Sequence, residues 1–209
     1  MDRCPTSVAE IDPTAPGTMI TGHFGFAAMV KARERSTPLW LLMLAAVWLD
    51  IVFVPLFLAG IETIRPVSNR GGYGAVIIYA DYSHSLVGML ALSCLLAAIC
   101  LPFWGRRSAI VIGSVAASHW MLDLLVHRAD MPLLPADALQ LPRLGFGLWR
   151  FPVVSAALEF GLILAGAWVY WRAAKDICAK DSRSTTLAAV AAASIVVFGA
   201  LTLAMDVIS

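Results

Sequence analysis

Charged residues are scarce in this chain of 209 residues. Asp, Glu, Lys and Arg make up 14% of it, whereas hydrophobic residues make up 60%. Soluble domains are roughly 25% charged and 45–50% apolar, so this composition excludes an ordinary soluble domain. The formal net charge of +1 leaves no basic excess for nucleic acid, and we expect no nucleic-acid partner.

Paired cysteines and a signal peptide are also missing. The four cysteines stand apart without a Cys-x-x-Cys motif, so we expect neither a disulfide framework nor a cysteine-based metal site. The first residues lack a basic segment followed by an apolar one. We therefore interpret residues 1–17 as a flexible N-terminal tail and residues 18–209 as a single domain.

Long apolar runs dominate the rest of the chain. A transmembrane helix needs about 20 mostly apolar residues, and five runs meet this length: 38–60, 83–104, 108–126, 151–171 and 185–205. A shorter run at 18–30 is marginal for a full span. The sequence predicts an all-α fold, a polytopic membrane helix bundle of five transmembrane helices plus a short N-terminal membrane helix.

The basic residues are unevenly divided between the two sides of this predicted bundle. Nine lie on one side: Lys31, Arg33, Arg35, Arg106, Arg107, Arg172, Lys175, Lys180 and Arg183. Five lie on the other: Arg65, Arg70, Arg128, Arg143 and Arg150. The positive-inside rule places the nine in the cytoplasm. We expect a bacterial-type inner (plasma) membrane protein with the loops 61–75 and 127–150 outside.

Ionisable residues inside these runs are the strongest functional signal, because each costs about 2.5–3.5 kcal/mol at the bilayer centre. Six such residues fall in the same, non-cytoplasmic half of the membrane: His23, Asp50, His84, His119, Asp123 and Glu159. Any one histidine alone could simply form a hydrogen bond between helices. Their shared depth favours a common site instead.

The segment S-H-W-M-L-D-L-L-V-H carries the densest part of this set. His119 and Asp123 are four residues apart and share one helix face, which His127 continues. Imidazole and carboxylate ligands suit Zn, Mn or Fe. Two ligands on one helix make half a site, so His23, Asp50 and His84 are the expected further metal ligands. We expect a divalent metal, Zn first and Mn as the alternative.

These motifs resemble the YdjM-like family of predicted membrane-bound metal-dependent hydrolases, over about residues 22–159. The likeness consists of G-H-F-G-F around His23, W-L-D-I-V around Asp50, Y-A-D-Y-S-H-S-L around His84, and S-H-W-M-L-D with His119 and Asp123. The chain departs from the family by lacking the proline before Asp50 and the first His-Arg of the third block. The V-H-R-A-D-M-P-L-L-P stretch is similar to a permease-like variant. The resemblance implies a metal site at the matching residues.

A hydrolase is the expected function: a metal-activated water would attack a lipid or lipid-linked ester or phosphodiester. Asp123 or Glu159 would be the catalytic base, although Glu159 could equally form an interhelical hydrogen bond. The predicted substrate contacts are His127, Arg128, Arg143, Trp149 and Arg150. The alternatives are a proton- or ion-coupled transporter that uses the same His/Asp/Glu cluster, and a structural membrane subunit.

Overall fold

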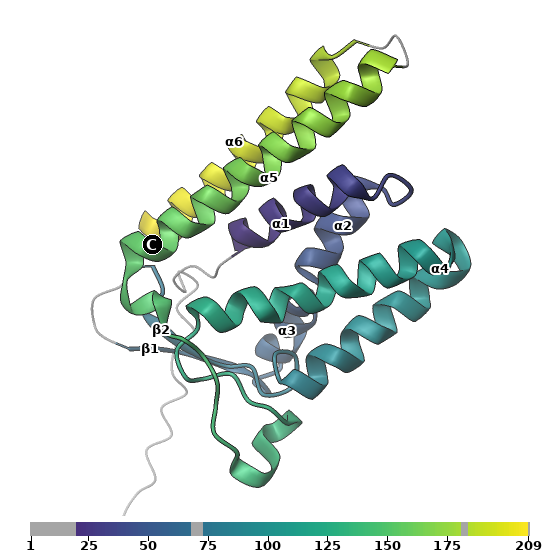
Figure 1. Ribbon diagram of the computed structural model, residues 1–209. Coiled ribbons are helices and arrows are strands. Elements are labelled where there is room, and N and C mark those ends of the chain that lie inside the picture. Colours follow the sequence, from purple (N-terminus) through teal and green to yellow (C-terminus); the bar gives the residue numbers. More distant parts are fainter. Residues whose placement is uncertain (1–19, 68–72, 181–183, 209) are drawn as a thin grey trace, which may run out of the picture.

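The protein is mostly helical in its computed structural model, which describes residues 20–67, 73–180 and 184–208 (Figure 1). The elements are, in chain order, α1 (Ile20–Arg33), α2 (Leu39–Ala46), α3 (Trp48–Leu58), β1 (Thr63–Pro66), β2 (Val76–Tyr79), α4 (Leu86–Val126), the 3₁₀ helices η1 (Pro135–Gln140) and η2 (Leu148–Arg150), α5 (Pro152–Lys180) and α6 (Thr186–Ile208). This content agrees with the predicted all-α class. The predicted tail, residues 1–17, lies outside the described residues.

Several helices have the dimensions of membrane spans. In the described part of the chain, α4, α5 and α6 are long and apolar enough to cross a membrane, and α2 with α3 passes the same test as a bent pair. These helices overlap the apolar runs of the sequence, and α4 includes nearly all of two of them. A membrane protein is therefore supported, while the count of five spans stays a prediction.

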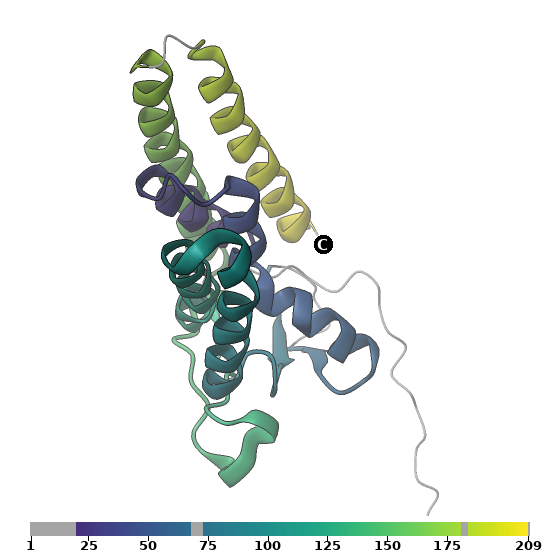
Figure 2. The ribbon, with the colours of Figure 1, turned by 90° about the vertical axis from the view of Figure 1, so that its right-hand side faces the viewer.

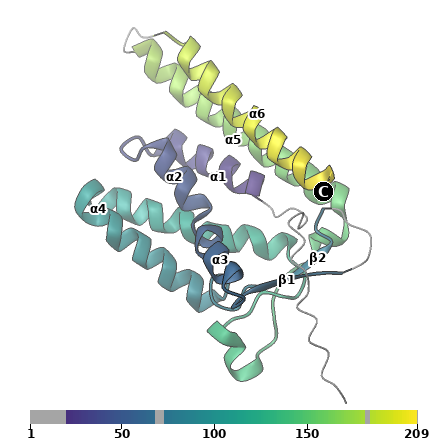
Figure 3. The same ribbon diagram turned by 180° about the vertical axis from the view of Figure 1, so that it is seen from behind.

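Helix α4 is a hairpin of two limbs (Figures 1 and 3). Gly105 interrupts it with φ 74° and ψ 168°, a backbone conformation that is essentially restricted to glycine. Nε2 of His84 and Nε2 of His119 lie 3.3 Å apart, whereas a straight helix would separate residues 35 positions apart by about 50 Å. The reversal at Gly105 therefore brings both ends of α4 to the same place.

The apolar run 38–60, predicted as one span, is bent in the structure. Helices α2 and α3 meet at Val47 with a bend of 47°, and Val47 itself has φ −115° and ψ 18°, outside the helical region. Ala46 and Asp50 lie on either side of this break, and both approach His119. The bend thus shapes one wall of the site described below.

The short helix α1 contacts α2, α4, α5 and α6 and lies within the bundle (Figure 1). Its 14 residues are too few for a full span. Its backbone approaches α5 closely: a Cβ added at Gly25 would lie 2.4 Å from the Leu162 carbonyl oxygen, and one at Gly166 would lie 2.1 Å from the Gly25 carbonyl oxygen. Small residues at such crossings let helices approach in lipid.

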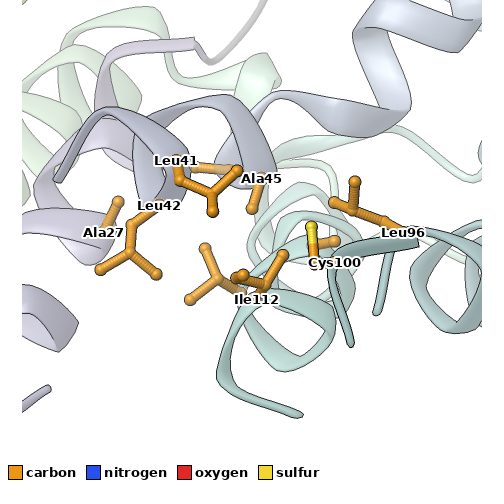
Figure 4. Packing of buried hydrophobic residues seen from close by; sticks show 10 residues of the cluster. Ala27, Leu41, Leu42, Ala45, Leu96, Cys100 and Ile112 are labelled. Carbon is orange, nitrogen blue, oxygen red and sulfur yellow. The ribbon is translucent and has the colours of Figure 1, made fainter. Parts of the chain in front are cut away.

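An apolar core joins α1, α2 and both limbs of α4 (Figure 4). Its buried members include Ala27, Leu41, Leu42, Ala45, Leu96, Cys100 and Ile112. Inside a bilayer this packing contributes mainly van der Waals contacts, because lipid tails are as apolar as the side chains. The cluster fixes α1 and α2 against the α4 hairpin.

Helices α5 and α6 pack along each other and extend away from the α4 hairpin (Figure 2). Large apolar side chains on this pair are exposed, among them Val153, Leu187, Val197, Leu201 and Met205. Such an apolar surface suits contact with lipid rather than with water.

Two connecting segments, one between α3 and α4 and one between α4 and α5, form a cap at one end of the bundle (Figure 1). Strands β1 and β2 pair antiparallel, with Thr63 opposite Tyr79 and Pro66 opposite Val76. The second segment, between α4 and α5, closes on itself through an antiparallel bridge between Met131 and Leu144. Both were predicted as loops, and the two-stranded sheet was not predicted. Val76 and Ile78 are buried, so β2 packs against the rest of the protein and is not a free loop.

Candidate metal centre

Five residues that the sequence singles out as metal ligands meet in one place. They come from four segments: His23 from α1, Asp50 from the first turn of α3, His84 from the turn before α4, and His119 and Asp123 from the second limb of α4. Four are buried, and Asp50 is half-buried. Helical spacing brings His119 and Asp123 together locally, whereas the other three arrive through the tertiary fold.

Asp123 is the centre of the cluster. Its Oδ1 lies 3.1 Å from Nε2 of His23, and its Oδ2 lies 3.1 Å from Nε2 of His119 and 3.6 Å from Nε2 of His84. The rings of His23 and His119 stack, with centroids 3.9 Å apart. One buried carboxylate therefore faces three imidazoles.

Two overlapping groups of these side chains could hold a metal ion. The first is His23, His119 and Asp123, and the second is Asp50, His84 and His119; within each group, the ligand atoms lie within 4.8 Å of one another. Nitrogen and carboxylate oxygen are the donors that Zn and Mn accept in proteins. The structure thus supports a metal-binding group, without specifying the metal.

In His119 and His84, the ring nitrogen that points away from the cluster has a hydrogen-bond partner. Nδ1 of His119 lies 2.7 Å from the carbonyl oxygen of Ala46, and Nδ1 of His84 lies 2.8 Å from Oγ of Ser83. The indole Nε1 of Trp120 donates to the His84 carbonyl oxygen at 2.8 Å. Such outer contacts fix ring orientation and direct Nε2 toward the centre, as in known metal sites.

Asp50 marks the open side of the cluster. Its side chain is 26% exposed, against 5% for Asp123. Its Oδ1 lies 3.6 Å from Nε2 of both His84 and His119, and its Oδ2 has no hydrogen-bond partner among the described residues. Asp50 therefore combines contact with the cluster and contact with the surroundings.

A small cavity lies among these side chains. Its volume is about 20 Å³, and it is lined by His23, Asp50, Phe53, Ile78, His84, His119, Asp123 and His127. A void needs about 10–15 Å³ on this measure to hold a water molecule. The cavity therefore has room for an ion or a water, and a larger substrate would have to approach from the open side.

His127 lies at the edge of the cavity, outside both candidate ligand groups. Its Nε2 is 3.9 Å from Oδ2 of Asp123, and its Nδ1 is 3.0 Å from Asp130. Burial alone would lower the pKa of His127, but the hydrogen bond to Asp130 and the nearby charges raise it above its ordinary value. Asp130 also accepts from the backbone N–H of Ile78 at 3.1 Å, which ties β2 to this histidine.

Glu159 of α5, predicted as a base or ligand, is fully buried but does not line the cavity. Its carboxylate accepts hydrogen bonds from the Tyr73 hydroxyl and from the backbone N–H of Gly22 at 3.2 Å. It therefore anchors α5 to the start of α1, next to His23. Its role as a base stays a prediction.

The predicted substrate contacts in the connection between α4 and α5 separate into two kinds. Trp149 is buried, and its ring lies 4.3 Å from that of His127. The three arginines do not line the cavity. Arg128 donates to the Gly74 carbonyl oxygen at 3.3 Å, and Arg150 is exposed.

Arg143 is held within the cap by two carboxylates. It donates to Asp81 at 2.8 Å and to Asp137 at 3.0 Å. Burial alone would lower the pKa of Arg143, but these hydrogen bonds raise it above its ordinary value. Arg143 therefore stabilises the connection between α4 and α5, whereas a role in binding a substrate phosphate stays a prediction.

Sequence reasoning missed the residues that support the ligands. Glu62, Ser83 and the Ala46 carbonyl surround His84 and His119. Glu62 lies in a segment read as a polar outer loop, and its burial depends on how that segment folds back. Only Ser83, next to His84 in the sequence, could have been noticed.

No family model, curated protein or solved structure matches this chain. The chain is therefore not assigned to a family, and its function is inferred from the site itself.

Proposed function

We propose that the protein is a membrane-embedded metal-dependent hydrolase that acts on a lipid or lipid-linked ester or phosphodiester. The observation that carries the proposal is a convergence of hydrogen-bond acceptors. A carbonyl oxygen only accepts, so Nδ1 of neutral His119 donates its proton to Ala46, and its Nε2 presents a lone pair. That lone pair faces the carboxylates of Asp123 at 3.1 Å and Asp50 at 3.6 Å.

Acceptors this close repel one another unless a proton or a metal cation lies between them. In the proposal, one divalent ion is held by His23, His119 and Asp123, which form one candidate group, together with His84 from the other. The inward atoms of these four side chains are all Nε2 or carboxylate oxygens. Zn²⁺ suits this donor set, with Mn²⁺ as the alternative. When bound, such an ion would supply a Lewis acid that acidifies water and polarises a carbonyl or phosphoryl oxygen.

The remaining side chains have distinct roles in this proposal. Asp50 lines the cavity and has a buried Oδ2 without a hydrogen-bond partner among the described residues, so it is placed to accept a proton from an attacking water. This replaces Asp123 as the base, because Asp123 is enclosed by imidazoles. His127 lies at the cavity edge, with its Nδ1 3.0 Å from Asp130, and would contact a substrate bound on this side. Exposed apolar helix faces favour a substrate from the membrane.

The test is the metal content of detergent-purified protein after incubation with Zn²⁺ or Mn²⁺. We expect about one equivalent in the wild type and its loss in His119→Ala and Asp123→Ala. Asp176→Ala is the matched control, because Asp176 is exposed near the end of α5, far from the cluster in sequence. Wild-type protein that binds neither metal would refute the hydrolase.

A proton- or ion-coupled transporter is the second candidate, because protons can satisfy the same acceptors. Here the decisive measurement is proton flux into liposomes in the presence of a chelator. Flux that persists without metal and is lost in Asp123→Ala would favour transport. Metal-dependent release of product from fluorogenic lipid esters or phosphodiesters would favour the hydrolase.

A further inference from the structure

A buried glutamate outside the cavity is linked to the cluster. Glu62, between α3 and β1, has no exposed surface. Its Oε1 accepts from the backbone N–H groups of Tyr82 and Ser83, both at 2.8 Å, and its Oε2 accepts from Oγ of Ser83 at 2.8 Å. The same Ser83 Oγ lies 2.8 Å from Nδ1 of His84.

The direction of this chain of hydrogen bonds follows from counting protons. A serine hydroxyl has one proton, and a carboxylate can only accept. Ser83 gives its proton to Glu62, so its oxygen must accept from Nδ1–H of His84. Nδ1 of His84 therefore carries a proton, and in the neutral ring Nε2 presents its lone pair. That Nε2 is the atom that faces Asp50 and Asp123.

We infer that Glu62 is a positioning residue that acts through Ser83 to fix the tautomer and orientation of His84. The consequence for metal affinity rests on the proposed function, but the protonation of His84 does not. In known metal sites, loss of such an outer partner lowers metal affinity about 10–100-fold.

The informative substitution is Glu62→Gln, which keeps the size of the side chain. The backbone N–H groups of Tyr82 and Ser83 must still donate to an oxygen, so the amide oxygen of the new side chain would face them. Its NH₂ group would then face Oγ of Ser83 and donate to it. The hydroxyl proton would then turn to Nδ1 of His84, which would accept instead of donating. The proton of the neutral ring would move to Nε2, the nitrogen needed as a ligand.

Glu34→Gln is the matched control. Glu34 is also buried, and its carboxylate also accepts from the backbone N–H and the hydroxyl of one serine, Ser36. It differs because its other partner is Arg107 rather than a histidine. Both variants remove one buried carboxylate, so a general loss of stability should affect them alike.

The experiment measures the ¹⁵N imidazole spectrum and Zn²⁺ affinity of wild type, Glu62→Gln and Glu34→Gln, together with metal-free thermal stability. The spectrum of His84→Asn identifies the His84 signals among the four histidines. We expect Nδ1 of His84 to be protonated in the wild type and in Glu34→Gln, and unprotonated in Glu62→Gln. We expect Zn²⁺ to bind Glu62→Gln about 10–100-fold more weakly than the wild type.

The outcomes separate the two proposals. An unprotonated Nδ1 of His84 in the wild type overturns the inference, even if Glu62→Gln does not fold. Unchanged affinity and an unchanged His84 spectrum in Glu62→Gln would also overturn it, and the metal site would stand. A wild type that binds no metal, with Nδ1 protonated as expected, would refute the hydrolase and leave the role of Glu62 intact.

Discussion

At the scale of single residues, the two aspartates of the centre have different environments. Asp123 is enclosed, with both oxygens within 3.6 Å of histidine nitrogens. Asp50 is 26% exposed and keeps one oxygen without a partner among the described residues. Two aspartates of equal charge and equal predicted membrane depth therefore have different surroundings. The proposed roles of metal ligand for Asp123 and proton acceptor for Asp50 rest on this difference.

This difference predicts that Asp50→Asn keeps the metal but loses hydrolysis. An amide cannot accept the proton of an attacking water, and general-base catalysis contributes about 10²–10⁴-fold in rate. Metal affinity should change by less than tenfold, whereas Asp123→Asn should abolish binding. Metal titration and turnover of a fluorogenic lipid ester measure the two effects. Retained turnover in Asp50→Asn would assign the base to another residue.

At the scale of elements, three backbone features place the candidate ligands. The left-handed Gly105 reverses α4 and brings His84 to His119. The bend at Val47 puts the Ala46 carbonyl and Asp50 on either side of a break that faces His119. The close crossing of α1 and α5 at Gly25 and Gly166 fixes the helix that carries His23.

The crossing predicts that Gly25→Ala lowers both thermal stability and metal affinity. Its new Cβ would lie 2.4 Å from a backbone oxygen of α5, so α1 must shift, and with it His23 two positions away. Overpacking of this kind costs about 1–3 kcal/mol. Thermal unfolding in detergent and Zn²⁺ titration measure the two losses.

Gly161→Ala on α5 is the control for this prediction. A Cβ at Gly161 meets nothing within 4 Å among the described residues, and alanine favours a helix over glycine by about 1 kcal/mol. This variant should therefore be as stable as the wild type or more so. Equal behaviour of the two variants would show that the α1–α5 crossing does not set the position of His23.

At the scale of the whole molecule, the centre lies next to the cap. Ile78 of β2 lines the cavity, and Trp149 of η2 covers His127. The opposite end carries Glu34 paired with Arg107 at 2.8 Å, which joins the α1–α2 connection to the turn of α4. Hydrogen bonds from Ser36 hold the pKa of Glu34 below its ordinary value, and Arg107 adds to this. The two ends are thus chemically distinct.

The distribution of Lys and Arg predicts that the cap faces away from the cytoplasm. In a background without the four native cysteines, Leu139→Cys in the cap should react with a membrane-impermeant maleimide in intact cells. Ser184→Cys, between α5 and α6, should react only after permeabilisation. Both positions are exposed, so accessibility is matched. The reverse pattern would invert the proposed orientation.

The sequence by itself determined the membrane class, the positions of the long helices and the pairing of His119 with Asp123. The apolar composition of a helix indicates whether lipid or water surrounds it. Residues four positions apart share one face of any α-helix. The remaining candidate ligands could be named as polar residues at a common predicted membrane depth, but their contacts could not be derived from local spacing.

The tertiary structure decided which residues meet and what supports them. His23, Asp50 and His84 reach the centre through the hairpin at Gly105, the bend at Val47 and the α1–α5 crossing. Glu62 and Ser83 were not predicted, and Glu159 and the arginines lie outside the cavity. The physical reason is that a helix fixes neighbours within one or two turns, whereas contacts across the chain depend on a few backbone reversals whose geometry no residue pattern specifies.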